Sequence, residues 1–339
     1  MRSLRSVPVL LALSVLTASC GDESEYVVVY TALDRSFSEP IFEMFTEKTG
    51  IRVRAQYDTE STKTVGLTNR IRAEKKRPRC DVFWNNEILN TLRLKQEGLL
   101  EKFVPAEAEN YPDAFKDAEG YWHGFAARAR VLIVNIELVK GEDFPKSVVD
   151  LADPRFRGQT GIAKPLFGTT ASHVACLFAT MGDEKATAFL RSLTDNKIQI
   201  HGGNKGYATA VSAGQAAFAL TDTDDAIIEL VAGKPVRIVY PDSAANEMGT
   251  LFLPNTLALV KGSPNPEAAK KLIDFLLSEE VETALANGPS AQIPLRKNAE
   301  PNPRVKNPGE LEAIMKVDFS RAAAAFDTAR KVVEERFLR

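Results

Sequence analysis

The chain has 339 residues, of which 44% are hydrophobic and 26% charged, a composition typical of a folded protein with room for two domains. Its 43 Lys and Arg residues nearly balance 45 Asp and Glu residues, and the formal net charge of -2 leaves no basic footprint for nucleic acid. Beyond the N-terminus, no apolar run approaches the roughly 20 residues of a membrane-spanning helix. The composition therefore excludes a nucleic-acid-binding protein and a multi-span membrane protein.

The first residues are typical of an export signal rather than of a folded element. Two arginines precede the apolar stretch 7–16, and small residues lead up to Cys20. The residues before Cys20 resemble a bacterial lipoprotein processing site, although Thr17 departs from the usual pattern and ordinary cleavage nearby is the alternative. We expect 1–19 to be a lipoprotein signal peptide, Cys20 to be lipidated, and 20–25 to be a linker. Cleavage before Cys20 removes both arginines, so the mature net charge becomes -4.

After the linker, strand-like runs alternate with amphipathic helical runs. The pattern predicts strands at 26–30, 51–57, 80–84, 130–135, 161–163, 198–201, 216–220 and 255–260. It predicts helices at 36–48, 62–75, 86–97, 169–181, 184–193, 206–213, 224–232 and 267–277, and the charged stretch 319–337 ends in a helix. Gly50 is placed to end the first helix. This alternation, which pauses at 121–125, predicts two α/β blocks built on mostly parallel sheets.

Motifs of known enzyme classes are scarce. The sequence has no phosphate-loop lysine motif, no nucleophile elbow and no zinc-protease motif, and its three histidines are far apart. The glycine-rich run 202–206 fits a strand-to-helix turn better than a phosphate cradle. Cys176 lies in an apolar run and is expected to be a buried free thiol, and a Cys80–Cys176 disulfide stays open because the sequence does not supply its geometry.

Three segments lie where a predicted strand ends and a helix begins, which is where α/β sheets bind ligands. The first is 30–34. The second is 165–172, whose glycine, threonine hydroxyls and free N–H groups suit an oxyanion, with plain helix capping as the alternative. The third is 221–225, whose three clustered carboxylates repel one another unless a positive group lies among them, with solvation on a loop as the alternative.

With its signal, its two α/β blocks and these three segments, the chain resembles periplasmic solute-binding proteins of ABC importers, and in detail their ferric-ion-binding branch. The likeness is carried by residues 28–30, 45–51, 80–84, 98–101, 128–131, 216–225 and 265–277. The resemblance implies a two-lobed α/β fold of the periplasmic-binding-protein type (class II-like). Each lobe would be a mixed, mostly parallel sheet flanked by helices, with the ligand cleft between the lobes.

The resemblance also implies where the chain is divided between the lobes. We expect lobe 1 to comprise 26–127 plus about 255–339, and lobe 2 to comprise 128–254. Arg128 and Arg130 would mark the first crossover, where one of them could meet the ligand's anion or form a hinge salt bridge.

The ligand residues of the ferric branch are not retained in this sequence. Where usual members carry a tyrosine pair, this chain has Thr223-Asp224, and Asp34 stands where many carry a histidine. The usual glutamate position corresponds to Asn86, with Glu87 adjacent. The anion-holding side, in contrast, is better retained.

Two interpretations of the ligand follow. The first is ferric iron or another hard cation with a co-bound anion, and the second is a phosphonate- or phosphate-bearing molecule such as an aminophosphonate. We expect the metal or cationic group to be bound by Asp34, Glu87, Asp222, Thr223 and Asp224. We expect the anion to be bound by Thr31, Gly168, Thr169, Thr170, Asn204, Thr221 and Arg128.

The resulting prediction is a monomeric, exported lipoprotein, periplasmic or on the cell surface, that is anchored through Cys20. It would capture its ligand without chemical change, need no cofactor, and deliver the ligand to an ABC permease in the inner membrane. The alternative from another class is an exported metal-dependent hydrolase. Turnover of a phosphate ester would distinguish the two.

Overall fold

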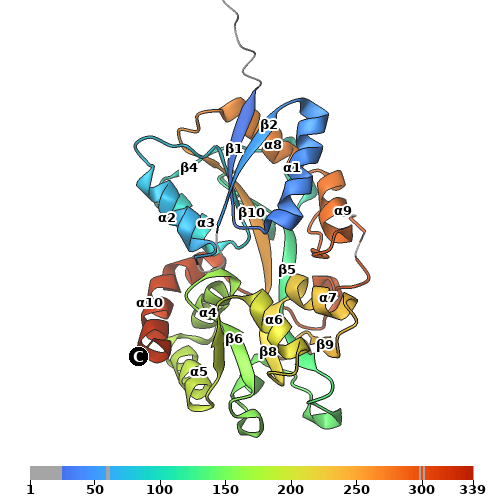
Figure 1. Ribbon diagram of the computed structural model, residues 1–339. Coiled ribbons are helices and arrows are strands. Elements are labelled where there is room, and N and C mark those ends of the chain that lie inside the picture. Colours follow the sequence, from blue (N-terminus) through green and yellow to red (C-terminus); the bar gives the residue numbers. More distant parts are fainter. Residues whose placement is uncertain (1–24, 59–61, 298, 301, 339) are drawn as a thin grey trace, which may run out of the picture.

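The computed structural model describes residues 25–58, 62–297, 299–300 and 302–338, and it consists of two α/β lobes joined through a long strand (Figure 1). The expected signal peptide and the lipidation site at Cys20 lie outside the described residues. Among the described residues, no helix is both long and apolar enough to cross a membrane. The two-lobed α/β fold that the resemblance implied is confirmed.

Lobe 1 is built on a mixed sheet. Its strands are β1 (Tyr26–Thr31), β2 (Arg52–Tyr57), β3 (Val82–Asn85), β4 (Leu100–Glu101) and β10 (Phe252–Val260). Strand β1 lies parallel to both β2 and β3, and β10 lies antiparallel to β3 and β4. Its helices are α1 (Arg35–Thr49), α2 (Val65–Ala73), α3 (Leu89–Gln96), α8 (Pro266–Leu276) and α9 (Glu279–Asn287).

Lobe 2 repeats the design with a second set of strands and helices. Its strands are β6 (Thr160–Ala163), β7 (Gln199–His201), β8 (Phe218–Asp222) and β9 (Val236–Val239), and β6 is parallel to both β7 and β8. Its helices are α4 (Gly168–Met181), α5 (Asp183–Asp195), α6 (Asn204–Ser212) and α7 (Thr223–Val231). Loops along the chain also contain short 3₁₀ turns, at Ala106–Asn110, Asp113–Phe115, Gly141–Asp143, Val148–Ala152, Pro154–Phe156 and Pro308–Glu310.

Strand β5 (His123–Asn135) belongs to both lobes. Its first half pairs with β10 and its second half with β8 and β9, so the sheets form one continuous, curled surface. The sequence indicated a strand only from Arg130 onward. The earlier half was missed because every residue of β5 is buried, which removes the alternation of polar and apolar residues that marks a half-exposed strand.

Most of the other predicted elements are confirmed within a few residues. Gly50 ends α1 in a left-handed conformation (φ 74°), and its N–H donates to the carbonyl of Thr46 at 2.8 Å. The sequence analysis did not predict β4, β9 or α9. These elements are two, four and nine residues long.

The C-terminal helix α10 (Phe319–Phe337) corrects the expected division of the chain. It packs most extensively against α4 of lobe 2, and it also contacts α3 of lobe 1 and α5 of lobe 2 (Figure 1). The expectation that residues 255–339 all belong to lobe 1 is therefore wrong for this helix. The buried side chains of α10, including Phe326 and Val333, fit the apolar faces of these neighbours, and no local sequence pattern specifies which lobe they meet.

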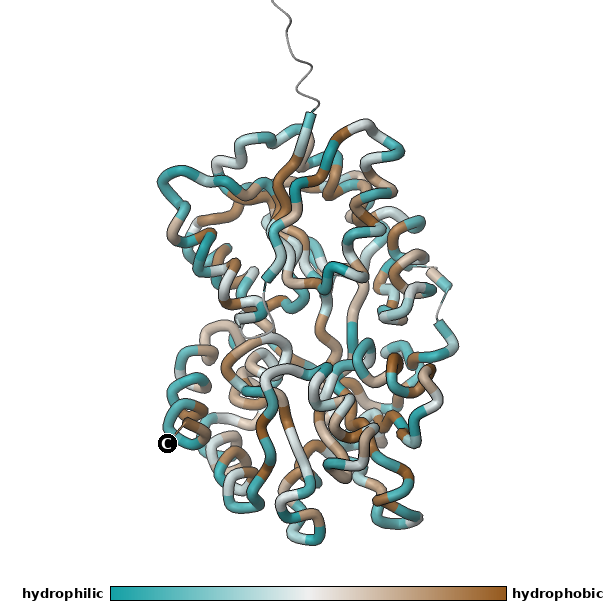
Figure 2. Tube along the Cα trace, viewed as in Figure 1, coloured by the Kyte–Doolittle hydropathy of each residue, from teal (hydrophilic) through white to brown (hydrophobic). Residues whose placement is uncertain are grey.

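Two hydrophobic clusters lie on opposite faces of the curled sheet. One lies beneath α2, α3, α4, α5 and α10, and the other beneath α1 and α6 to α9, with apolar residues along the inner strands (Figure 2). Each cluster extends across both lobes. Cys80 and Cys176 are buried in the first cluster and both are free thiols, which confirms the expectation for Cys176.

Candidate functional site: a charged pocket between the lobes

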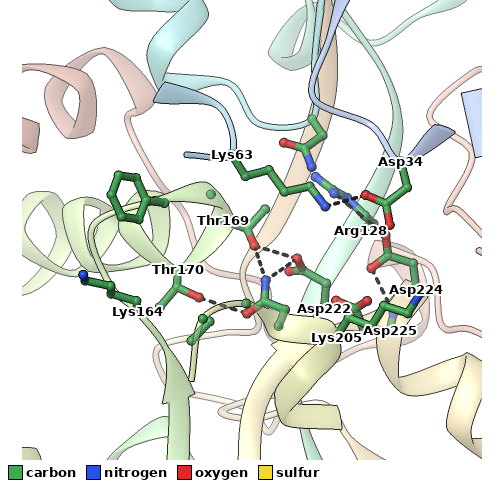
Figure 3. Close-up of a pocket in the computed structure, with 17 residues that line it drawn as sticks. Asp34, Lys63, Arg128, Lys164, Thr169, Thr170, Lys205, Asp222, Asp224 and Asp225 are labelled. Atoms are coloured by element: carbon green, nitrogen blue, oxygen red, sulfur yellow. Dashed lines mark hydrogen bonds and ion pairs between the residues drawn. The ribbon is translucent and has the colours of Figure 1, made fainter. Parts of the chain in front are cut away.

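A small pocket lies between the lobes, where strands end and helices begin (Figure 3). Its cavity volume is about 30 Å³, room for one or two water-sized spheres. All three segments singled out in the sequence contribute to it. The lining residues are Asp34, Lys63, Asn86, Arg128, Ala163, Lys164, Phe167, Gly168, Thr169, Thr170, Gly202, Gly203, Asn204, Lys205, Asp222, Asp224 and Asp225.

Three carboxylates gather on the lobe 2 side of the pocket. Asp222 ends β8, and Asp224 and Asp225 lie in the first turn of α7. One oxygen from each can be chosen so that all three atoms lie within 4.8 Å of one another. This spacing is compatible with three oxygen ligands around one cation.

Asp222 is held in place by a buried network. Its Oδ1 accepts from Arg130 Nη1 at 2.7 Å, and its Oδ2 accepts from the Thr169 hydroxyl at 2.6 Å and from Asn204 Nδ2 at 2.9 Å. Burial alone would raise the pKa of Asp222, but the Arg130 and Arg128 guanidiniums and these hydrogen bonds bring its pKa below the usual value. Asp222 therefore stays ionised.

Asp224 and Asp225 are less well compensated. Burial raises the pKa of Asp224 to about 6, with Arg128 opposing the rise and Asp222 adding to it. Burial and the two neighbouring carboxylates also raise the pKa of Asp225. The ionised forms of Asp224 and Asp225 are thus disfavoured by burial, and a cation bound among the three carboxylates would stabilise them.

The lobe 1 side contributes an ion pair. Asp34 lies at the start of α1, and its Oδ1 is 2.6 Å from Lys63 Nζ, so the two side chains approach the pocket together (Figure 3). Next to this pair, the Gly168 N–H of lobe 2 donates to the Lys63 carbonyl at 3.0 Å. That bond ties the lobes together, so the structure shows a closed arrangement.

Arg128 brings unsatisfied hydrogen-bond donors to the pocket wall. Only 2% of its surface is exposed, and its Nη1 is 3.9 Å from Asp224 Oδ2, too far for a hydrogen bond. Its Nε and Nη2 have no partner among the described residues. Lys164 and Lys205 also line the pocket. These cations could hold an anion next to the carboxylates.

The threonines of the second segment have a different role from the one expected. The Thr169 hydroxyl bonds Asp222, and the Thr170 hydroxyl donates to Asn204 Oδ1 at 3.0 Å and accepts from Arg130 Nη2 at 3.1 Å. Their hydroxyls are thus occupied within the protein. What this segment offers a ligand is the start of α4, whose first N–H groups have no acceptor within the helix.

Four expected site residues do not line the pocket. The Glu87 carboxylate accepts from the N–H groups of Leu89 and Asn90, from Asn85 Nδ2 and from the Ser172 hydroxyl, so it caps α3 and meets α4 instead of a ligand. The Thr31, Thr221 and Thr223 hydroxyls are fully buried and bond to backbone groups of Leu33, Asn204 and Ala129, respectively. We remove these four from the set of candidate ligand residues.

The sequence analysis missed several lining residues. Lys63, Lys164 and Lys205 lie on separate loops and helices, and a lysine in a loop carries no signal of its own. Asn86 was noted only as a departure, yet its buried Oδ1 has no partner among the described residues and lines the pocket. Asp225 was visible as part of the acidic run. No tyrosine is among the described residues that line the pocket.

Two lobes closing on a charged pocket at strand and helix ends define a solute-binding protein. The chain belongs to the family described as bacterial extracellular solute-binding protein, which matches residues 90–316. Members of such a family capture a small ligand outside the cytoplasm and hand it to a transport system.

Known relatives match most of the chain. Iron uptake protein A1 of Synechocystis sp. is 26% identical over 347 residues, which covers 95% of this chain and 93% of the relative. A putative 2-aminoethylphosphonate-binding periplasmic protein of Salmonella typhi is 27% identical over 79% of this chain and 77% of its own length. The crystal structure of iron-bound HitA from Pseudomonas aeruginosa superimposes with a TM-score of 0.82 at 27% identity, covering 91% of this chain and 99% of that one.

Proposed function

We propose that this protein captures ferric iron together with a small anion in the interlobe pocket and delivers it to an ABC importer. The observation that carries the proposal is the cluster of Asp222, Asp224 and Asp225, with carboxylate oxygens within 4.8 Å of one another. Carboxylate oxygens are the ligands that hard cations prefer. Burial raises the pKa of Asp224 and of Asp225, and a bound cation would stabilise their ionised forms.

The dimensions of the pocket support a small ligand. A cavity of about 30 Å³ accommodates an ion with one or two small co-ligands in this closed arrangement. Arg128, with two unpaired nitrogen atoms, supplies the position for the anion beside the metal. The names of an iron uptake protein and of iron-bound HitA, to which the chain is similar, support the same ligand.

Binding can be tested directly on residues 21–339, which include every described residue. The protein is loaded from ferric citrate, desalted, and analysed for iron and by native mass spectrometry. We expect one iron per chain. Because no tyrosine is among the described lining residues, bound iron should lack the visible absorption of a phenolate–iron bond.

A paired set of variants assigns the site. Asp224→Asn with Asp225→Asn should abolish iron binding and leave the fold intact. Asp113→Asn with Asp195→Asn removes two exposed carboxylates outside the pocket and should bind iron like the wild type. Iron retained by the first pair, or lost by both, would reject the acidic cluster as the metal site.

A second candidate ligand is a zwitterion such as 2-aminoethylphosphonate. It is favoured by the unpaired guanidinium nitrogens of Arg128 and by the Salmonella relative. Its phosphonate would lie against Arg128 and the start of α4, and its amine would lie among the three carboxylates. Thermal stabilisation by 2-aminoethylphosphonate in a metal-free sample, with none by ferric citrate, would select this ligand instead of iron.

The finer points of location and partnership are part of the same proposal. We infer that the protein is an exported monomer, held to the membrane by a lipid on Cys20, and that its partner is an ABC permease. The family supports export and a permease partner. Replacing Cys20 by Ala should release the protein from membranes in cell fractionation, and continued membrane association would contradict the lipid attachment.

A further inference from the structure

We propose that the end of lobe 1 opposite the pocket is a docking surface for the anionic phospholipid headgroups of a bilayer. Its centre is a run of four cations among five consecutive residues, Lys75, Lys76, Arg77 and Arg79, in the loop between α2 and β3. All four residues are exposed, and the loop is hydrophilic in Figure 2. Together with Lys261, these residues are called the basic end below.

The basic end lies where the chain enters lobe 1. Strands β1 and β3 are parallel, and the Asp81 N–H donates to the Val28 carbonyl at 2.9 Å, so the loop before β3 lies beside the start of β1. The pocket lies at the opposite, carboxyl ends of the same strands, since its lining residues Asp34 and Asn86 follow β1 and β3. Residues 20–25 span roughly 20 Å when fully extended. The lipid proposed above on Cys20 would therefore keep the basic end close to the bilayer.

The cations of the loop are not neutralised by the protein. Nearby arginines are paired: Arg70 with Glu74 at 2.9 Å, and Arg72 with Glu97 at 2.6 Å. In the part of the chain that the structure describes, no acidic side chain forms an ion pair with any of the four loop cations. Their charge is therefore available to an external anion.

A hollow between these cations has the chemistry of a lipid headgroup site. It has a volume of about 260 Å³ and is lined by Lys75, Arg79 and Lys261, with apolar groups such as Leu99 between them. Glu74 also lines it, but its carboxylate is held by an arginine and by a tyrosine hydroxyl. Cations around an apolar floor match a lipid phosphate and the glycerol attached to it.

The charge of the rest of the molecule would orient this contact. The mature chain from Cys20 onward has a net charge of -4, although the basic end alone contributes five positive charges. An anionic surface therefore attracts the basic end and repels most other faces. In this orientation the pocket faces away from the bilayer, toward incoming ligand, and delivery to a permease requires release from the surface.

Vesicle flotation tests the docking surface without the lipid anchor or the iron ligand. Residues 21–339 are mixed with phosphatidylcholine vesicles prepared with or without phosphatidylglycerol, at low and high salt. We expect binding only to the anionic vesicles, and loss of that binding as salt screens the charges. A variant with Lys75, Lys76, Arg77 and Arg79 all replaced by Gln should bind roughly a hundredfold or more weakly, since each cation near an anionic surface contributes roughly fivefold.

A charge-matched control separates a docking surface from general electrostatics. Lys140, Arg157, Lys185 and Arg191 are exposed residues of lobe 2, and replacing all four by Gln should leave vesicle binding unchanged. Both variants should unfold like the wild type. Both should also bind the same amount of iron as the wild type, even if that amount is zero. Failure of the iron proposal therefore does not affect this test. Equal loss in both variants, no preference for anionic vesicles, or wild-type binding by the first variant would overturn the proposal.

Discussion

Arg130 and Asp222 form an ion pair behind the pocket wall, with Nη1 and Oδ1 2.7 Å apart and neither side chain more than 5% exposed. Arg130 also donates to the hydroxyls of Thr169 and Thr170, so a single guanidinium connects β5 to β8 and to the start of α4. This network fixes the Asp222 carboxylate before any ligand arrives. Arg130 is thus a positioning residue whose own side chain does not line the pocket.

Replacing Arg130 by Met should destabilise the protein strongly, because Asp222 would then be a buried charge without its ion-pair partner. We expect the free energy of unfolding to fall by about 3–5 kcal/mol in urea denaturation. The matched control is Arg155→Met, which breaks exposed pairs with Asp143 and Asp153 and should cost about 1 kcal/mol or less. Similar losses in the two variants would show that the buried pair is not a special determinant of stability.

Replacing Asp224 by Asn should weaken cation binding by more than roughly a hundredfold, because changes to groups that only support a metal ligand already cost tenfold to a hundredfold. Protons compete with the cation for Asp224, whose pKa is about 6, so wild-type affinity should fall as the pH drops through that value. The variant should lose this part of the pH dependence. Competition with citrate at several pH values measures both effects, and a pH-independent wild-type affinity would contradict the assignment.

Gly168 is needed for its backbone conformation rather than for space. Its φ is +58°, and a Cβ added there would meet no atom within 4 Å. Gly168→Ala should therefore cost about 1 kcal/mol of stability through backbone strain and weaken the lobe-closing bond to the Lys63 carbonyl. Gly202→Ala is the control, since Gly202 also lines the pocket, has no atom within 4 Å of an added Cβ and has no strained φ. Chemical denaturation and ligand affinity should change only in the first variant.

Glu282 predicts a pH dependence of stability near the crossover between the lobes. Its carboxylate accepts from the N–H of Ala126, a β5 residue with φ +41°, and burial raises its pKa from 4.5 to about 7 despite the N–H groups around it. The folded state binds this proton more tightly than the unfolded chain does. The resulting stabilisation is complete below pH 4.5 and is lost as the pH rises through about 7.

Glu282→Gln removes that titration while retaining an oxygen acceptor. The difference between the wild-type and variant unfolding free energies should change with pH between 4.5 and about 7 and become constant above that range. Thermal or urea denaturation across these pH values measures it. A constant difference from acid to neutral pH would mean that Glu282 is ionised throughout in the folded protein.

The local features of the fold could be read from the sequence. The charged stretch 319–337 was expected to end in a helix and is helical throughout as α10, and Gly50 ends α1 as its position implied. The acidic run 221–225 and the Gly168 segment were located because each directly follows a strand. Such features depend on side chains three or four residues apart, on caps and on turns, all of which are written into short stretches of chain.

The sequence by itself therefore determined most of the elements and located three segments that contribute to the pocket, and the family resemblance implied the lobe type. Only the tertiary structure decided that Glu87 caps α3 while Asn86 lines the pocket, that Lys63 meets Asp34, and that α10 joins lobe 2. Each of these depends on which distant group a buried side chain meets, and that choice is set by the free energy of satisfying buried charges and hydrogen bonds over the whole chain.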